Sequence, residues 1–490
     1  MRELLPPPAA AQAPEEYYRV ETVATPEGIA PEVSAIAFRN DGSLIACFRR
    51  GQVYILDPAA SEWKEFASGL HTPLGVMPGR PGELFIAQVP ELTRVVDTDA
   101  DGRADLYETI SDDWGLTGNY HEFVAGPLRD AQGNFYISVG CTSDNAEVTL
   151  PVRGEFTERG HRAAEQREGI INKVDHYSPV PYRGWILKIT PEGKMLPFAS
   201  GFRQPNGICF NSESDLFSVD NQGEWVGTSP LHHVTQGRFY GHPASLNWRP
   251  DFKGKDPVEV PVETVAELRT PPAIQFPQND MAGSVAQPLF DTTAGKFGPY
   301  SGQLFVAEWT YPRILRVDLE KVGGEYQGAC FIFLEGNGLH TGNNRLAFAP
   351  DGSLYVAQTS RMWGASEGLQ RIVWTGKPPL DILRMRLTET GFELTFTKPV
   401  NAATAKDPSA YSMTHYYYRY HSDYGSPKTD VTPVKISNVD ISPDGRRVVL
   451  TVDQLVAGRV YELRPGRIES AQGDRLITRI AAYTLNRLKD

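Results

Sequence analysis

The sequence predicts an all-β fold: a six-bladed β-propeller, with a seventh blade if a terminal strand closes one, followed by a small immunoglobulin-like β-sandwich. A recurring phrase is the first observation behind this prediction. It consists of a polar or aromatic lead-in, an apolar stretch, a turn ending in glycine and a short apolar strand. The second observation is composition, because 45 glycines, 38 prolines and 40% hydrophobic residues are typical of a turn-rich globular protein. The phrase occurs at residues 35–48, 75–88, 124–140, 207–220, 288–308 and 346–358.

Each copy of the phrase predicts the two inner strands of one blade. Asp-Gly and related glycine turns between alternating apolar residues are hairpin signals, as in AIAFRNDGSLIACF at 35–48 and LAFAPDGSLYVAQ at 346–358. One blade cannot bury both faces of its sheet, so blades close into a ring around a central channel. We therefore expect the functional residues at the channel.

The chain divides into three segments. Residues 1–16, rich in proline and alanine, predict a disordered tail; residues 17–377 predict the propeller and residues 380–490 the sandwich. The last segment alternates apolar and polar residues in short stretches, a pattern typical of a small sandwich. Two insertions, a charged one near 151–183 and a proline-rich one near 243–280, are expected to build the mouth of the channel.

An aromatic run lies inside the predicted sandwich and has two interpretations. It consists of Tyr416, Tyr417, Tyr418 and Tyr420. These rings could contact carbohydrate, but packing against the propeller is the interpretation that we favour.

Composition excludes some classes of function. The net charge is −12, from 48 basic and 60 acidic residues, which argues against a nucleic-acid partner. No stretch of about 18 uncharged apolar residues occurs, so no membrane span is predicted. We expect a periplasmic or secreted protein whose signal peptide is not part of this chain. Without a C-x-x-C motif, the four cysteines predict buried free thiols: Cys47, Cys141, Cys209 and Cys330.

The segment DTDADGRADLYE at 97–108 predicts a calcium site. Oxygen ligands stand at loop positions 1, 3, 5, 9 and 12, which are Asp97, Asp99, Asp101, Asp105 and Glu108. Glycine stands at position 6, and Arg103 at position 7 can offer its backbone carbonyl, so the loop matches the EF-hand pattern. Because it joins blade strands rather than helices, we expect a structural calcium ion and not a sensor.

Histidines cluster at segments that lead into the predicted inner strands. They include His71 in GLHTP, His121 in NYHEF and His340 in GLHTGNN, while His233 follows the segment Asp220-Asn221-Gln222. Such positions face the channel, so we expect these side chains to meet there. Imidazole serves both as a general base and as a metal ligand.

Three further motifs carry a family resemblance: YRGWILKITPEGK at 182–194, ASGFRQPNGICF at 199–210 and the upstream HEFVAGPL that begins at His121. With them, residues 30–377 resemble the soluble quinoprotein glucose and sorbosone dehydrogenases, six-bladed propellers that hold pyrroloquinoline quinone over the channel. The resemblance implies that His121 is the general base for a sugar hydroxyl. It also implies that Arg203 stabilises the reduced cofactor and that Gln204 lies beside the quinone oxygens.

Some positions depart from the family pattern. Tyr120 stands where the family has the aspartate that orients its histidine, and Gln204 replaces an asparagine. Asn206 belongs to the same turn and is a further candidate for cofactor binding. For the family's cationic clamp on the cofactor carboxylates, the candidates are Arg313, Arg345, Arg361 and Arg371.

Three functions stay open on the sequence alone, and all of them involve a small carbohydrate. The first is a quinone-dependent sugar dehydrogenase. The second is a metal-dependent carbohydrate lyase, hydrolase or isomerase, with Tyr120 or His121 as the base. Its zinc or manganese ion would be held by His71, His121, His233 and His340, with Glu122, Glu308 or Gln358 nearby. The third is a propeller that binds a glycan or a protein without catalysis.

Overall fold

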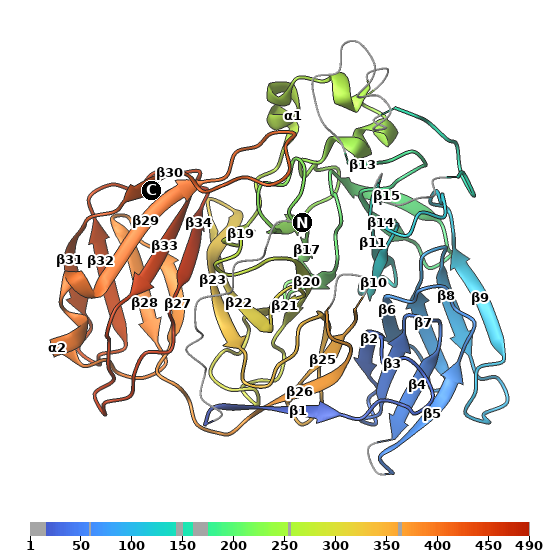
Figure 1. Cartoon of the computed structure of the whole chain (residues 1–490), viewed down its shortest axis with the longest axis horizontal. Helices are drawn as coiled ribbons and strands as arrows, with labels where there is room; N and C mark the ends of the chain where they lie inside the picture. The colour runs from blue at the N-terminus through green and yellow to red at the C-terminus, as the bar shows by residue number, and fades with distance from the viewer. Residues whose placement is uncertain are drawn as a thin grey trace.

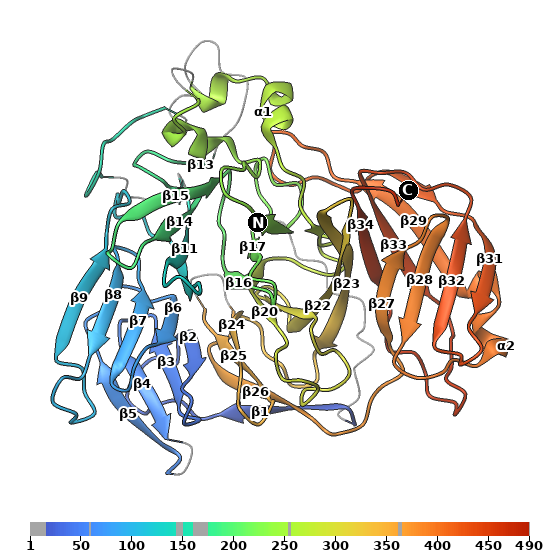
Figure 2. The same cartoon turned by 180° about the vertical axis from the view of Figure 1, so that it is seen from behind.

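The computed structural model describes residues 16–57, 60–143, 150–159, 175–252, 256–360 and 365–489. It confirms the all-β propeller: a ring of antiparallel sheets stands beside a smaller C-terminal module (Figures 1 and 2). Most of the predicted N-terminal tail, residues 1–15, lies outside the described residues. No helix of the described segments is long and apolar enough to cross a membrane.

Six groups of four strands make up the ring in the described part of the chain: five are separate four-stranded sheets, and one belongs to an eight-stranded sheet. The first sheet consists of β2 (Val33–Phe38), β3 (Leu44–Phe48), β4 (Val53–Asp57) and β5 (Glu62–Ala67). The second consists of β6 (Gly75–Pro78), β7 (Glu83–Ala87), β8 (Leu92–Val96) and β9 (Leu106–Ser111). The third consists of β10 (Val124–Arg129), β11 (Phe135–Val139), β14 (Trp185–Ile189) and β15 (Met195–Ser200). The fourth consists of β16 (Ile208–Phe210), β17 (Leu216–Val219), β18 (Pro230–Val234) and β19 (Ile274–Gln275). The fifth group consists of β20 (Val285–Phe290), β21 (Leu304–Glu308), β22 (Arg313–Val322) and β23 (Glu325–Glu335). The sixth consists of β24 (Asn343–Phe348), β25 (Leu354–Gln358), β26 (Gly368–Trp374) and β1 (Tyr18–Val23).

The six sequence repeats form the first two strands of the six sheets, as predicted. The first strands contact one another in a closed cycle, from β2 through β6, β10, β16, β20 and β24 back to β2. The N-terminal β1 pairs with β26, with Tyr18 opposite Trp374, so the two ends of the propeller segment close one sheet together. The four cysteines are buried and free, as expected.

The C-terminal module consists of two sheets around an apolar core, to which β23 of the propeller contributes Ala329 and Phe331. One sheet holds β27 (Ile382–Leu387), β28 (Gly391–Phe396), β32 (Arg447–Val452) and β31 (Ile436–Ile441). The other holds β34 (Ala481–Leu485), β33 (Arg459–Pro465), β29 (Tyr411–Tyr417) and β30 (Thr429–Pro433). The second sheet continues β23 of the propeller, with Cys330 opposite Ala482, so the two parts share one eight-stranded sheet. The immunoglobulin-like topology of this module stays a prediction.

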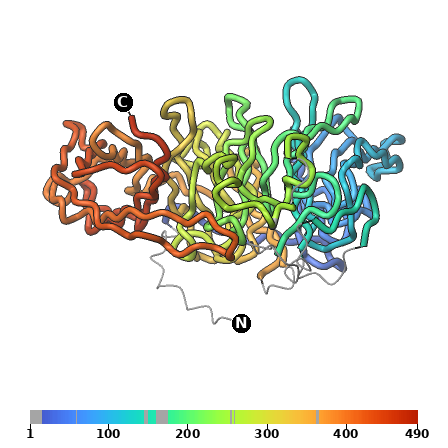
Figure 3. Tube along the Cα trace, turned by 90° about the horizontal axis from the view of Figure 1, so that it is seen from above, coloured from blue at the N-terminus to red at the C-terminus, as the bar shows by residue number. Residues whose placement is uncertain are grey.

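Short elements lie between the blade strands and at the edges of the module. They are β12 (Thr142–Ser143) paired with β13 (His176–Tyr177), the 3-10 turns Pro243–Trp248, Pro257–Glu259 and Pro408–Ala410, and the helices α1 (Val262–Leu268) and α2 (Ala402–Ala405). Figure 3 views the ring edge-on, with the C-terminal module at its side. In that view a loop of the module runs along one face of the ring.

Candidate functional site

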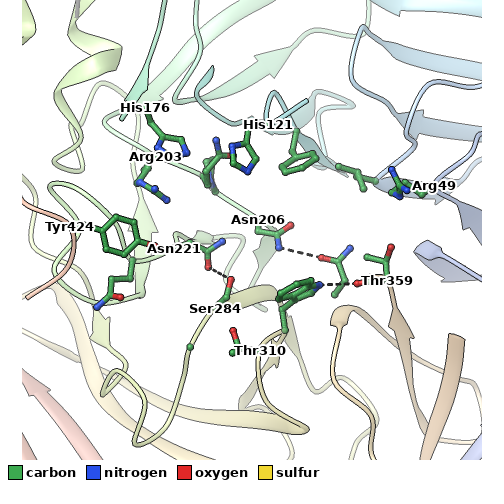
Figure 4. A pocket seen from close by; sticks show the side chains of 18 residues that line it. Arg49, His121, His176, Arg203, Asn206, Asn221, Ser284, Thr310, Thr359 and Tyr424 are labelled. Carbon is green, nitrogen blue, oxygen red and sulfur yellow. Dashed lines mark hydrogen bonds between the residues drawn. The ribbon is translucent and has the colours of Figure 1, made fainter. Parts of the chain in front are cut away.

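A cavity of about 360 Å³ opens at one end of the channel (Figure 4). Its walls come from residues that precede the first strand of a sheet, such as Arg203 before β16, or that follow the second strand, such as Thr359 after β25. In a hairpin these two positions lie at the same edge, so several blades place polar side chains at one mouth. No acidic side chain lines the cavity among the described residues. Lead-in residues such as His121 and Arg203 therefore face the channel at this end.

Four predicted site residues line this one cavity: His121, Arg203, Gln204 and Asn206. The backbone N–H groups of Arg203 and Gln204 both donate to Asp220, at 2.7 Å each. The Gln204 amide also donates to the carbonyl of Cys141 at 2.7 Å. Tyr120 does not line the cavity, but its ring packs on that of His121 with the ring centroids 4.3 Å apart.

The Glu224 carboxylate interacts with three side chains, those of Arg203, His176 and His242. It is 1% exposed, and its Oε2 accepts from Nε of Arg203 at 3.0 Å. Its Oε1 lies 2.9 Å from Nδ1 of His176 and 3.5 Å from Nε2 of His242. Burial alone would raise the pKa of Glu224, but the Arg203 guanidinium and the neighbouring imidazoles hold it well below its ordinary value. The same carboxylate raises the pKa of Arg203 against the effect of burial, so the pair stays ionised.

His176 faces the same cavity and is 2% exposed. Burial, reinforced by the charge of Arg203, lowers the pKa of His176 to about 4, so its imidazole is neutral at pH 7. Its ring centroid lies 5.4 Å from that of His121, and Figure 4 shows both rings beside Arg203. Its Nε2 is buried and has no hydrogen-bond partner among the described residues.

Close packing against glycine keeps two of these side chains in place. A Cβ atom on Gly223 would lie 2.0 Å from Nε of Arg203, and one on Gly140 would lie 2.3 Å from Oε1 of Gln204. Any side chain at either position would displace the functional group beside it.

Sequence reasoning missed His176 and Glu224. His176 lies in the insertion near 151–183, where no repeat marks a channel-facing position, and Glu224 lies in the loop between β17 and β18. It also missed Tyr424 of the C-terminal module, which lines the cavity and lies close to the aromatic run at 416–420. The run itself packs as we expected, since Tyr416 and Tyr418 belong to an apolar core that the module shares with the propeller.

The proposed four-histidine metal site is wrong. His71 and His340 are exposed, and the backbone N–H of each donates to a glutamine side chain. His233 packs between Phe217 and Tyr326, away from the residues that line the cavity. Within the described residues, only a group of aspartates brings three metal-ligating side chains together. The two acids named beside this site are bound elsewhere: Glu122 pairs with Arg183, and Glu308 accepts backbone N–H groups of Gly283 and Ser284.

The predicted cationic clamp is also not assembled as expected. Arg313 is bound by Glu335 and does not line the cavity, and Arg371 pairs with Glu21. Arg361 lies outside the described residues. Arg345, in contrast, lies directly behind the cavity wall, with its Nη1 donating to the side chains of Asn206 at 3.1 Å and Asn344 at 3.0 Å.

The acidic loop between β8 and β9 brings part of the predicted calcium site together. The ligand atoms of three carboxylates lie within 4.8 Å of one another: Asp97, Asp99 and Asp101. Asp105 instead binds the backbone and hydroxyl of Thr98, at 2.9 and 2.6 Å, and Glu108 accepts from Arg94 at 2.9 Å. The side chain of Arg103 pairs with Glu65 of the neighbouring sheet. Calcium binding here stays a prediction.

A scan against models of protein families matches residues 56–363 to one model, described as a domain of unknown function (DUF7133). The chain belongs to this family. No curated protein matches the chain. Among solved structures, a protein of Thermus thermophilus described as an oxidoreductase (glucose dehydrogenase) aligns over 73% of this chain and 100% of its own, with 19% identity and a TM-score of 0.50.

The quinone domain of a pyranose dehydrogenase from Coprinopsis cinerea, in its holo form, is similar over 75% of this chain and 98% of its own. Its identity is 13% and its TM-score is 0.50. At these identities the two likenesses show the propeller fold alone.

Proposed function

We propose that this chain is a sugar-active oxidoreductase whose site is the cavity at the mouth of the propeller, with His121 as the general base. The convergence of His121, Arg203 and Gln204 on one cavity supports the proposal. These residues come from two different blades, and they are the ones that the resemblance to the quinoprotein dehydrogenases assigns to chemistry. The propeller fold shared with the glucose and pyranose dehydrogenases supports it as well.

The donor set of the cavity suits pyrroloquinoline quinone, which presents carbonyl and carboxylate oxygens. The walls offer amide, imidazole and guanidinium groups, and the described lining has no acid to repel an anion. Arg345 adds a buried cation behind Asn206 and Asn344, and within the described part of the chain its Nη2 has no hydrogen-bond partner. Burial lowers the pKa of Arg345 to about 9, so an anionic group in the cavity would stabilise its charge.

Asn206 and Asn344, with Arg345 behind them, would hold the carboxylate side of the quinone, and Arg203 with Gln204 would hold its carbonyl oxygens. A quinone held there would supply the acceptor for the hydride that the sugar loses.

The residues of the chain have separate roles in this reaction. His121 accepts the proton of the sugar hydroxyl, for which an imidazole is suited because its ordinary pKa lies near 6.5. Arg203 keeps a fixed positive charge at the site, because Glu224 and Asp220 hold its side chain and backbone. Asn221 and Ser284, joined by a 3.0 Å hydrogen bond across the cavity wall, can orient the remaining hydroxyl groups.

The test combines quinone titration with turnover. Purified protein is titrated with pyrroloquinoline quinone, and oxidation of D-glucose and other aldoses is followed with an artificial electron acceptor. We expect stoichiometric uptake and a fall of about 10² to 10⁴ in kcat for His121→Ala, the usual worth of general-base catalysis. His71→Ala is the matched control, because His71 is exposed and outside the cavity, and should change kcat less than twofold.

Failure to take up the quinone, or a His121→Ala variant within a few-fold of wild type, would overturn the proposal. Sugar binding without any turnover would favour a propeller that only binds glycans.

A further inference from the structure

The loop between β29 and β30, residues 418–428, leaves the C-terminal module and lies against the propeller (Figures 1 and 3). Backbone hydrogen bonds fasten it there. The N–H of Trp225 donates to His421 at 3.0 Å, and the N–H of Gly425 donates to Gly223 at 2.9 Å. A further bond joins the N–H of Ser426 to Gly227 at 2.8 Å. The loop is thus bound to the propeller segment 223–227, which also carries Glu224.

The tyrosines of this loop differ in their surroundings. Tyr420 packs on the propeller, with its hydroxyl donating to the carbonyl of Gly241 and its ring 4.7 Å from the Arg269 guanidinium carbon. Tyr424 also lies against the propeller, but its side chain is 64% exposed while it lines the cavity. The guanidinium carbon of Arg203 lies 5.4 Å from its ring centroid, and Figure 4 shows Tyr424 beside Arg203 and Asn221. The structure therefore presents an aromatic ring to solvent at the rim of the cavity.

We infer that the 418–428 loop is a carbohydrate-recognition element and that Tyr424 stacks on the sugar ring next to the reacting one, so that the substrate is a disaccharide or longer. This inference rests on the proposed function. The apolar C–H face of a sugar ring covers an aromatic ring, while its hydroxyl groups can bond to polar neighbours such as Asn221 and Gln222. A tyrosine on a loop already fixed by backbone bonds supplies this contact with little loss of conformational entropy.

The experiment measures sugar binding by calorimetry on the full chain without added quinone. The probes are D-glucose and the disaccharides maltose and cellobiose. We expect Tyr424→Ala to weaken binding of at least one disaccharide about tenfold and to leave binding of D-glucose within twofold. Tyr424→Phe keeps the ring and should stay within twofold for every probe. Tyr107→Ala is the matched control, because Tyr107 is 44% exposed on β9 and does not line the cavity.

The inference fails if neither disaccharide binds the wild type, or if Tyr424→Ala binds both disaccharides as well as the wild type does. It also fails if the variant loses D-glucose binding to the same extent, because Tyr424 would then contact the reacting sugar. Turnover separates this inference from the proposed function. Disaccharide binding that depends on Tyr424, without any quinone-dependent oxidation, would retain the recognition element and reject the dehydrogenase. Quinone-dependent oxidation of a disaccharide with a KM unchanged by Tyr424→Ala would retain the dehydrogenase and reject the recognition element.

Discussion

Replacing Glu224 by glutamine should destabilise the propeller by about 3 to 5 kcal/mol, the usual cost of breaking a buried ion pair. Glutamine keeps the volume of the side chain but removes its charge. Arg203, 6% exposed, then loses the carboxylate that accepts from its Nε at 3.0 Å. Two unit charges about 4 Å apart in a medium of effective dielectric 20 attract by about 4 kcal/mol, which agrees with this range.

A double-mutant cycle isolates the interaction. The free energy of unfolding is measured in urea for the wild type, Glu224→Gln, Arg203→Gln and the double variant, with the buried Trp225 as a neighbouring fluorescent reporter. We expect a coupling energy of at least about 2 kcal/mol, because the double variant removes both charges of the Glu224–Arg203 pair. Glu325→Gln is the control, since Glu325 and Arg487 form a pair of which each side chain is 52% exposed, and it should cost less than about 0.5 kcal/mol. Additivity of Glu224→Gln and Arg203→Gln within about 0.5 kcal/mol would refute the reasoning.

Two further predictions concern pH and calcium. The pKa of His176 is lowered to about 4 in the folded chain, so between pH 6.5 and pH 4 the unfolded chain binds more protons at this residue. The free energy of unfolding therefore decreases as the pH is lowered through this range. His176→Gln removes this term, and its cost in unfolding free energy should therefore be smaller at pH 4.5 than at pH 7 by about 2 to 3 kcal/mol; an equal cost at both pH values would contradict the assignment. Addition of calcium should raise the melting temperature, and EDTA should reverse the change, because binding to the native state stabilises it. The double substitution Asp99→Asn and Asp101→Asn should abolish this response, and identical melting curves with and without calcium would reject the site.

Local pattern was sufficient to predict the blades. The turn of AIAFRNDGSLIACF lies between β2 and β3, and that of LAFAPDGSLYVAQ between β24 and β25, because a hairpin depends on residues that are adjacent in sequence. The same periodicity correctly placed His121 and Arg203 at the mouth, since each precedes the first strand of a repeat.

Contacts between distant segments could not be predicted in this way. The lead-in histidines His71 and His340 occupy repeat positions, yet they are exposed rather than gathered into a site. The repeats show which residues lie near the mouth, but not which way each side chain turns. In His71 and His340 the backbone N–H donates to a glutamine side chain, and this tertiary contact is absent from the repeat pattern.

The sequence by itself determined the propeller, the repeat of its inner strands and four of the residues at its mouth, because these follow from periodicity and from short motifs. The tertiary structure alone decided the rest of the site. Glu224 joins Arg203 to His176 from separate segments of the chain, and a loop of the C-terminal module brings Tyr424 to the rim. These residues meet because the ring and the shared sheet fold them together, and the energy of burying charges in pairs depends on that proximity and not on their order along the chain.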